Sequence, residues 1–270
     1  MTHNKSPQLN SQQLNYRQRG QGEHLILIHG LFGSLENLNM VAKTLSQYYC
    51  VTSVDVRNHG NSFHQEGMSY AVLAQDVITL MNDLAIKSCH VLGHSMGGKI
   101  AMQIALSNPE RVNKLAVADI APVKYSAHHL TIIEGLQAID LTKIKTRKDA
   151  SIQLTPYVEN VGVRQFLLRN LTQNEQGEFH FKCNLDYIAQ GYQQIMQGIE
   201  NTPQQPISSF KGDTLFIKGG DSDYILPEHQ NAIKALFPEA KAKIIQGAGH
   251  WLHAEKTTSF NKILIDFLSS

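Results

Sequence analysis

A serine lies in a glycine-rich turn near the middle of the chain, in the pentapeptide Gly93-His94-Ser95-Met96-Gly97. The apolar run Cys89–Gly93 precedes the serine, and the amphipathic segment Met96–Leu106 follows it. This strand–turn–helix context is the one that a nucleophile elbow needs, because the sharp turn tolerates only small flanking residues and lifts the hydroxyl above the sheet. The pattern predicts nucleophilic catalysis by Ser95 through a covalent intermediate.

A serine hydroxyl needs a base at neutral pH, so a histidine must reach it from elsewhere in the chain. His250 is the best placed of the 13 histidines, because it follows the last strand-like run in the glycine-rich segment Gly247–Trp251. His250 and His253 have a spacing that two metal ligands on one helix could have, but no third ligand matches, so we expect no metal. Six other histidines are interpreted as surface or core residues: His3, His64, His128, His129, His180 and His229.

The base in turn needs a carboxylate that fixes its tautomer and stabilises the imidazolium. Asp119 closes the apolar run Leu115–Asp119, and Asp223 lies shortly after the run Thr214–Lys218. Asp221 is a third and weaker candidate. Since all three lie between Ser95 and His250 in the chain, the order of residues leaves the choice of acid open.

A tetrahedral oxyanion requires backbone N–H groups that already point at it. The amide of Met96, directly after the serine, is expected to be one donor. The loop His29–Gly33 follows an apolar run and is expected to supply the second donor from the amide of Leu31.

The same turn also resembles a nucleotide-binding loop. Residues Gly93–Lys99 satisfy the first seven positions of a P-loop, and Leu115–Asp119 could be the strand that ends in a metal-binding aspartate. The eighth position of a P-loop must be Ser or Thr to hold magnesium, and this chain has Ile100 there. Ile100 therefore favours the nucleophile elbow.

Short apolar runs alternate with longer amphipathic ones along most of the chain. The runs are followed by Gly, Asn or Asp, and we predict strands over Leu14–Arg19, His24–His29, Cys50–Asp55, Cys89–Gly93, Leu115–Asp119, Thr214–Lys218 and Ala242–Ile245. Apolar residues at helical spacing predict helices over Leu35–Tyr48, Ser69–Leu84, Met96–Leu106 and Thr257–Leu268. This alternation predicts an α/β fold with a mostly parallel sheet covered on both faces.

The alternation stops between Pro122 and Pro206, where helix-forming residues dominate and strand-like runs are missing. We therefore expect residues 13–121 and 207–270 to form the core and residues 122–206 to form a helical cap, or lid, inserted in it. Residues 1–12 are polar and are expected to be a loosely attached tail.

Composition argues against several classes of protein. Net charge is +1, from 24 basic and 23 acidic residues, which gives no global field for nucleic acid or an anionic membrane. Three sparse cysteines, Cys50, Cys89 and Cys183, favour reduced thiols over a disulfide framework or a zinc site. No apolar stretch has the length of a membrane span or the form of a secretory signal, so we expect a cytoplasmic protein, monomeric or a small homo-oligomer.

These motifs together resemble those of α/β-hydrolases, most closely the small bacterial YbfF-type esterases, from about Leu14 to Leu268. The residues that carry the resemblance are His29–Ser34, Asp55–Gly60, Gly93–Lys99, Asp119–Val123 and Gly247–Lys256. The resemblance implies hydrolysis of short acyl esters and acyl thioesters, including acyl-CoA, beneath a helical cap. It implies Asp119 as the acid and Ser222 as a helper serine, with no cofactor. Asp223 occupies the position that most α/β-hydrolases use for the acid, so both aspartates remain candidates, with Asp119 preferred.

The leading hypothesis is therefore a carboxylesterase or thioesterase for small acyl substrates. Other reactions on the same fold are carbon–carbon bond hydrolysis, a lyase step or perhydrolysis, and a receptor could keep the pocket without turnover. Binding of a CoA phosphate would require basic residues in the cap. Basic residues on an exposed helix are usually only solvated surface. The candidates are Lys124, Lys143, Lys145, Arg147 and Lys148.

Overall fold

The central sheet follows the predicted pattern of strands. The computed structural model describes residues 13–199 and 208–270, so the predicted tail 1–12 and the predicted cap boundary at 206 lie outside the described residues. Within the described residues, seven strands form one sheet in the order β1-β3-β2-β4-β5-β8-β9. Only β1 is antiparallel to its neighbour, β3. The strands are β1 (Tyr16–Arg19), β2 (His24–Ile28), β3 (Cys50–Val54), β4 (Cys89–His94), β5 (Val112–Ala118), β8 (Thr214–Gly219) and β9 (Lys241–Ile245).

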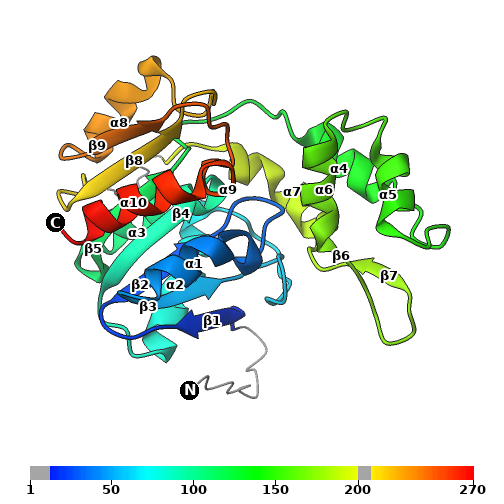
Figure 1. The fold of residues 1–270 in the computed structure, drawn as a ribbon, viewed down its shortest axis with the longest axis horizontal. Coiled ribbons are helices and arrows are strands. Elements are labelled where there is room, and N and C mark those ends of the chain that lie inside the picture. The colour runs from blue at the N-terminus through cyan, green and yellow to red at the C-terminus, as the bar shows by residue number, and fades with distance from the viewer. Residues whose placement is uncertain (1–12, 200–207) are drawn as a thin grey trace.

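Helices cover both faces of this sheet, as Figure 1 shows. Apolar stripes of α1 (Asn39–Leu45) and α10 (Thr257–Leu268) pack together on one face. The other face is covered by α2 (Tyr70–Asp83), α3 (Met96–Ser107) and α8 (Gln230–Leu236). The predicted helix over Leu35–Tyr48 is divided, because a 3-10 turn, η1 (Leu35–Leu38), precedes α1. Shorter elements are η2 (Pro109–Arg111), η4 (Pro227–His229) and α9 (Leu252–Glu255).

Residues 122–199, called the inserted segment below, leave the sheet after β5 and lie to one side of it (Figure 1). The expectation that this stretch contains no strands was wrong, since β6 and β7 form a small antiparallel hairpin. The sequence hides it because each strand has only three residues, and the hairpin depends on a turn in which Asn174 Oδ1 accepts from the Glu178 N–H at 2.8 Å. The elements are α4 (Leu130–Gln137), α5 (Arg147–Leu154), α6 (Val161–Leu167), η3 (Leu168–Asn170), β6 (Leu171–Gln173), β7 (Phe179–Phe181) and α7 (Leu185–Met196).

The parallel strands bring the chemically interesting residues to one edge. Carboxyl ends of parallel strands meet at the same edge of a sheet, which is where α/β folds place their sites. His29 follows β2, Ser95 follows β4, Asp119 follows β5, and the loop with Ser222 follows β8. Within the described residues, no helix is long and apolar enough to cross a membrane.

Candidate active site

Ser95 occupies a strained turn between β4 and α3. Its φ is 54° and its ψ is −122°, a left-handed backbone that a residue with a side chain rarely adopts. A Cβ at position 93 would lie 2.0 Å from the carbonyl oxygen of Gly97, and one at position 97 would lie 2.2 Å from that of Ile28. Both flanking glycines are therefore required by the close approach of backbone to backbone.

Three side chains from three strand ends form one chain of hydrogen bonds. Ser95 Oγ lies 2.9 Å from His250 Nε2, and His250 Nδ1 lies 2.7 Å from Asp119 Oδ2. Since the carboxylate can only accept, Nδ1 carries the proton and the lone pair of Nε2 faces the serine. Asp119 is completely buried and also accepts from the Gly219 N–H at 2.9 Å and from the Ser222 hydroxyl. This geometry is that of a nucleophile, a base and an orienting acid.

The position after β8 does not supply a second acid. Asp221 and Asp223 are both exposed, and neither carboxylate forms a hydrogen bond or ion pair with another described residue. Between them, the buried Ser222 turns inward to Asp119. The alternative of Asp223 as partner of the histidine was wrong, because the loop directs this side chain to solvent.

Two backbone amides near Ser95 are free to bind an oxyanion. Met96 is the first residue of α3, so its N–H has no partner within the helix. The N–H of Leu31 donates to no other described residue. Both residues line the same cavity as Ser95.

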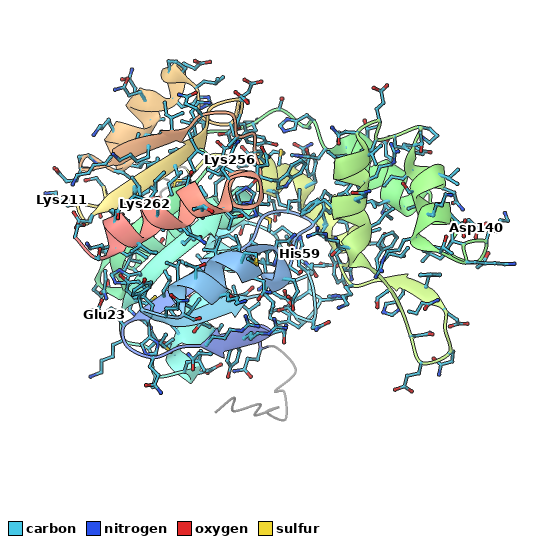
Figure 2. All side chains as sticks on the ribbon, viewed as in Figure 1. Glu23, His59, Asp140, Lys211, Lys256 and Lys262 are labelled. Atoms are coloured by element: carbon cyan, nitrogen blue, oxygen red, sulfur yellow. The ribbon has the colours of Figure 1, made fainter. Side chains whose placement is uncertain are left out.

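The loop that carries Leu31 is held from both sides. The N–H of Phe32 donates to His59 Nε2 at 3.2 Å, and its carbonyl accepts from Asn170 Nδ2 at 2.6 Å. Burial lowers the pKa of His59 to about 3, so the ring is neutral and can accept this bond. Figure 2 shows His59 where the core and the inserted segment meet.

Two further rings fix the imidazole of His250. Tyr224 stacks on it, with ring centroids 3.9 Å apart and an interplanar angle of 20°. His94 Nε2 lies 2.8 Å from the carbonyl oxygen of His250 and holds its backbone. Burial lowers the pKa of His94 well below its usual value, so His94 is neutral and adds no charge beside the base.

A cavity of about 330 Å³ lies above Ser95, between the core and the inserted segment. Its wall is mostly apolar, and Phe166 of α6 approaches Trp251 of the core with ring centroids 5.5 Å apart. The apolar residues contributed by the inserted segment are Ile132, Val163, Phe166, Leu167, Ile195 and Met196.

His128 and His129 also line this cavity, which the sequence analysis missed. Tyr224 Oη lies 3.1 Å from His128 Nε2 and 3.3 Å from His129 Nε2. Burial lowers the pKa of His129 to about 4 and also lowers that of His128. His128 is exposed, as the interpretation as a surface or core residue expects, and both histidines also line the cavity. Their position at the cavity cannot be predicted from the spacing of residues in the sequence, because the inserted segment must first fold back toward the core.

The nucleotide-binding alternative does not fit the structure. A P-loop lysine must reach phosphates held by the loop. Lys99 instead points away into the fold, where Nζ donates to the carbonyl oxygens of Val123 (2.8 Å) and Gln197 (2.5 Å). Among residues 13–199 and 208–270, no group of three or more His, Cys, Asp or Glu side chains could hold a metal ion.

The basic residues of the inserted segment do not converge on the cavity. Lys143 pairs with Asp140 at 2.8 Å, and Figure 2 shows Asp140 far from the sheet. Arg147 donates to the Leu171 carbonyl at 2.8 Å. Lys124, on the stretch that leaves the core, is exposed.

An α/β sheet with a serine turn at its carboxyl edge defines a broad class of enzymes, and the comparisons place the chain within it. A family model described as "alpha/beta hydrolase fold" matches residues 23–257. The chain is 39% identical over 253 residues to the sn-1-specific diacylglycerol lipase ABHD11 of Mus musculus, covering 91% of this chain and 80% of that protein. It is 35% identical over 262 residues to esterase YbfF of Escherichia coli, covering 95% and 99%.

A solved structure described as a marine microorganism esterase is 40% identical and has a TM-score of 0.90, covering 95% of this chain and 100% of that one. The chain therefore belongs to the α/β-hydrolase family, as its motifs predicted, and within it to the group of esterases and lipases that these relatives represent.

Proposed function

We propose that the protein is a serine esterase that hydrolyses small acyl esters and acyl thioesters through an acyl-enzyme on Ser95. The observation that carries the proposal is the hydrogen-bonded chain from Ser95 through His250 to Asp119. The relatives support membership of the esterase and lipase group.

In the first half of the reaction, Ser95 Oγ attacks the acyl carbonyl carbon while His250 Nε2 takes the hydroxyl proton. Asp119 stabilises the imidazolium that results. The N–H groups of Met96 and Leu31 bind the oxyanion of the tetrahedral intermediate. His250 then gives its proton to the departing alkoxide or thiolate as the bond to the acyl carbon breaks.

In the second half, a water molecule attacks the acyl-enzyme and His250 takes a proton from it. A second tetrahedral intermediate forms in the same oxyanion site and expels Ser95 Oγ, which recovers its proton from the imidazolium. The products are the free acid and the restored serine.

The inserted segment acts as a cap that selects the acyl group. It supplies one wall of the 330 Å³ cavity, and this wall is apolar. Binding of a hydrocarbon chain against such a wall is favoured by the area it removes from water. We therefore assign the apolar part of the cavity to the acyl chain and its part beside His128 and His129 to the leaving group.

Esters and thioesters differ in the leaving group, which is an alcohol in an ester and a thiol in a thioester. Acyl-CoA and the matching acyl N-acetylcysteamine thioester present the same acyl group, and only the former carries phosphates. If the exposed Lys124 binds a CoA phosphate, Lys124→Ala raises KM for acyl-CoA and leaves KM for the short thioester unchanged. Equal KM values for both thioesters in the wild type would exclude phosphate recognition.

The direct test is the Ser95→Ala variant assayed with p-nitrophenyl acetate and p-nitrophenyl butyrate. Loss of hydrolysis in folded protein is expected, because among the described residues only the Ser95 hydroxyl forms a hydrogen bond with His250 Nε2. Ser269→Ala, at an exposed serine near the C-terminus, is the matched control and keeps wild-type rates. Retained turnover in Ser95→Ala would overturn the assignment.

A further inference from the structure

Lys99 occupies a buried position, where an apolar residue would be expected. It lies on α3, one turn after Ser95, and only 1% of its surface is exposed. The residue is among those that line the cavity, and its ammonium group donates to the carbonyl oxygens of Val123 and Gln197 at 2.8 and 2.5 Å. These two acceptors come from opposite ends of the inserted segment.

Val123 and Gln197 belong to the two linkers that join the inserted segment to the core, residues 122–125 and 196–199. The linkers run side by side, because the Tyr125 N–H donates to the Met196 carbonyl at 2.9 Å and the Ile199 N–H to the Pro122 carbonyl at 3.0 Å. The paired linkers therefore fix the two ends of the inserted segment against each other.

Core packing does not explain a lysine at this position. Within the described residues, no carboxylate forms an ion pair with Lys99. The ammonium faces the rings of Tyr70, 5.3 Å from Nζ to centroid, and Tyr125, 4.8 Å away. Burying a charge without a counter-ion opposes folding, and a methionine of similar shape would avoid that cost.

We propose that Lys99 is a positioning residue that holds both linkers on the helix of the catalytic serine and so sets the inserted segment over the active site. This inference rests on the proposed function for its kinetic consequence. Its structural consequence, the pairing of the linkers, is independent of any activity.

The protonation state of Lys99 makes the pairing of the two linkers depend on pH. Burial lowers the pKa of Lys99 to about 7, and a neutral amine has two N–H donors for its two carbonyl acceptors. If the linkers separate, water reaches the amine and its pKa rises, so the separated form binds more protons. Rising pH from about 7 to about 10 therefore favours the held form. The facing Tyr70 and Tyr125 stay neutral, since burial raises both pKa values, and His129, which lines the same cavity, is neutral above about pH 4.

The activity-independent test is amide hydrogen exchange on the Lys99→Met variant. The N–H groups of Tyr125 and Ile199 are expected to exchange faster than in the wild type, because their linkers are no longer held. Lys114→Met is the matched control, since Lys114 Nζ also donates to backbone carbonyls, those of Phe267 and Ser270, on another part of the core. Unchanged exchange in folded Lys99→Met would overturn the proposal, whatever the enzyme hydrolyses.

The kinetic test compares kcat/KM for p-nitrophenyl hexanoate and p-nitrophenyl acetate as a ratio. The longer acyl group reaches the wall formed by the inserted segment, so Lys99→Met is expected to lower the ratio about fivefold, the loss of roughly one hydrogen bond, through KM and not kcat. The ratio removes any effect of pH on the chemical step, because both esters are cleaved by the same serine and base.

In the wild type this ratio should rise between about pH 7 and about pH 10, and in Lys99→Met it should be flat. If the variant fails to fold, the wild-type profile alone decides. A ratio that is independent of pH in the wild type contradicts a role for Lys99 in setting the inserted segment.

Discussion

Replacing Asp119 by asparagine tests which carboxylate orients the base. The Gly219 N–H points at Oδ1 from 2.9 Å, so an asparagine keeps its oxygen there and turns its NH₂ group toward His250 Nδ1. Nδ1 must then accept, the proton moves to Nε2, and the imidazole can no longer take the proton of Ser95. Loss of the correct tautomer in a Ser-His-Asp site costs a factor of about 10⁴ in kcat, or about 5 kcal/mol of barrier.

The assay is the steady-state hydrolysis of p-nitrophenyl butyrate by Asp119→Asn and by the matched control Asp223→Asn. Asp223 is exposed, so its variant should keep kcat within about twofold, as surface substitutions do. KM should change little in either variant, because neither carboxylate lines the cavity. A collapse of kcat in Asp223→Asn with near-normal activity in Asp119→Asn would refute the reasoning.

Three further outcomes follow from the same geometry. Ser222→Ala removes one of the donors to Asp119 and should lower kcat about tenfold with little change in KM, which the same ester assay measures; an unchanged kcat would show that Ser222 does not help orient the acid. Gly97→Ala places a Cβ 2.2 Å from the Ile28 carbonyl and should lower the melting temperature and abolish activity, and a variant with both intact would contradict the required close approach. The pKa of Lys99 is about 7 in the folded protein and higher when unfolded, so the unfolded state binds more protons between these values and the wild type gains stability relative to Lys99→Met as pH rises from about 7 to about 10. Urea unfolding at several pH values measures this difference, and a constant difference would show that the ammonium is not desolvated.

Much of the core is predictable from the sequence because its signals are local. The strands that carry Ser95 and Asp119 are short and apolar, and the glycines around the serine are dictated by contacts within one strand–turn–helix unit. Boundaries were less accurate where polar residues enter an element. β5 starts at Val112, three residues before the predicted start, since Asn113 and Lys114 interrupt its apolar pattern.

The order of residues left the choice of acid open, and only the family resemblance favoured Asp119, because the choice depends on the direction of one loop. Asp221, Ser222 and Asp223 are consecutive, and only the folded path of the loop after β8 shows that the serine turns inward and both aspartates turn outward. The chain order of the candidate residues is the same for either acid.

The residues that line the cavity could not be predicted from the sequence either. His128 and His129 read as ordinary polar residues until the inserted segment brings them to Tyr224, 95 residues away along the chain from His129. Lys99 looked like the seventh residue of a P-loop, and its partners are carbonyls that only the two linkers provide. Such contacts form only when distant segments of the chain fold against each other, and they leave no periodic pattern in the sequence.

Labelling with a fluorophosphonate probe, followed by peptide mapping, tests the nucleophile directly. The probe forms a stable adduct only with a serine activated by a base. We expect one equivalent per chain on Ser95, loss of ester hydrolysis in step with labelling, and no adduct in Ser95→Ala. An active enzyme that stays unlabelled at Ser95, or that carries the adduct on another residue, would contradict nucleophilic catalysis by Ser95.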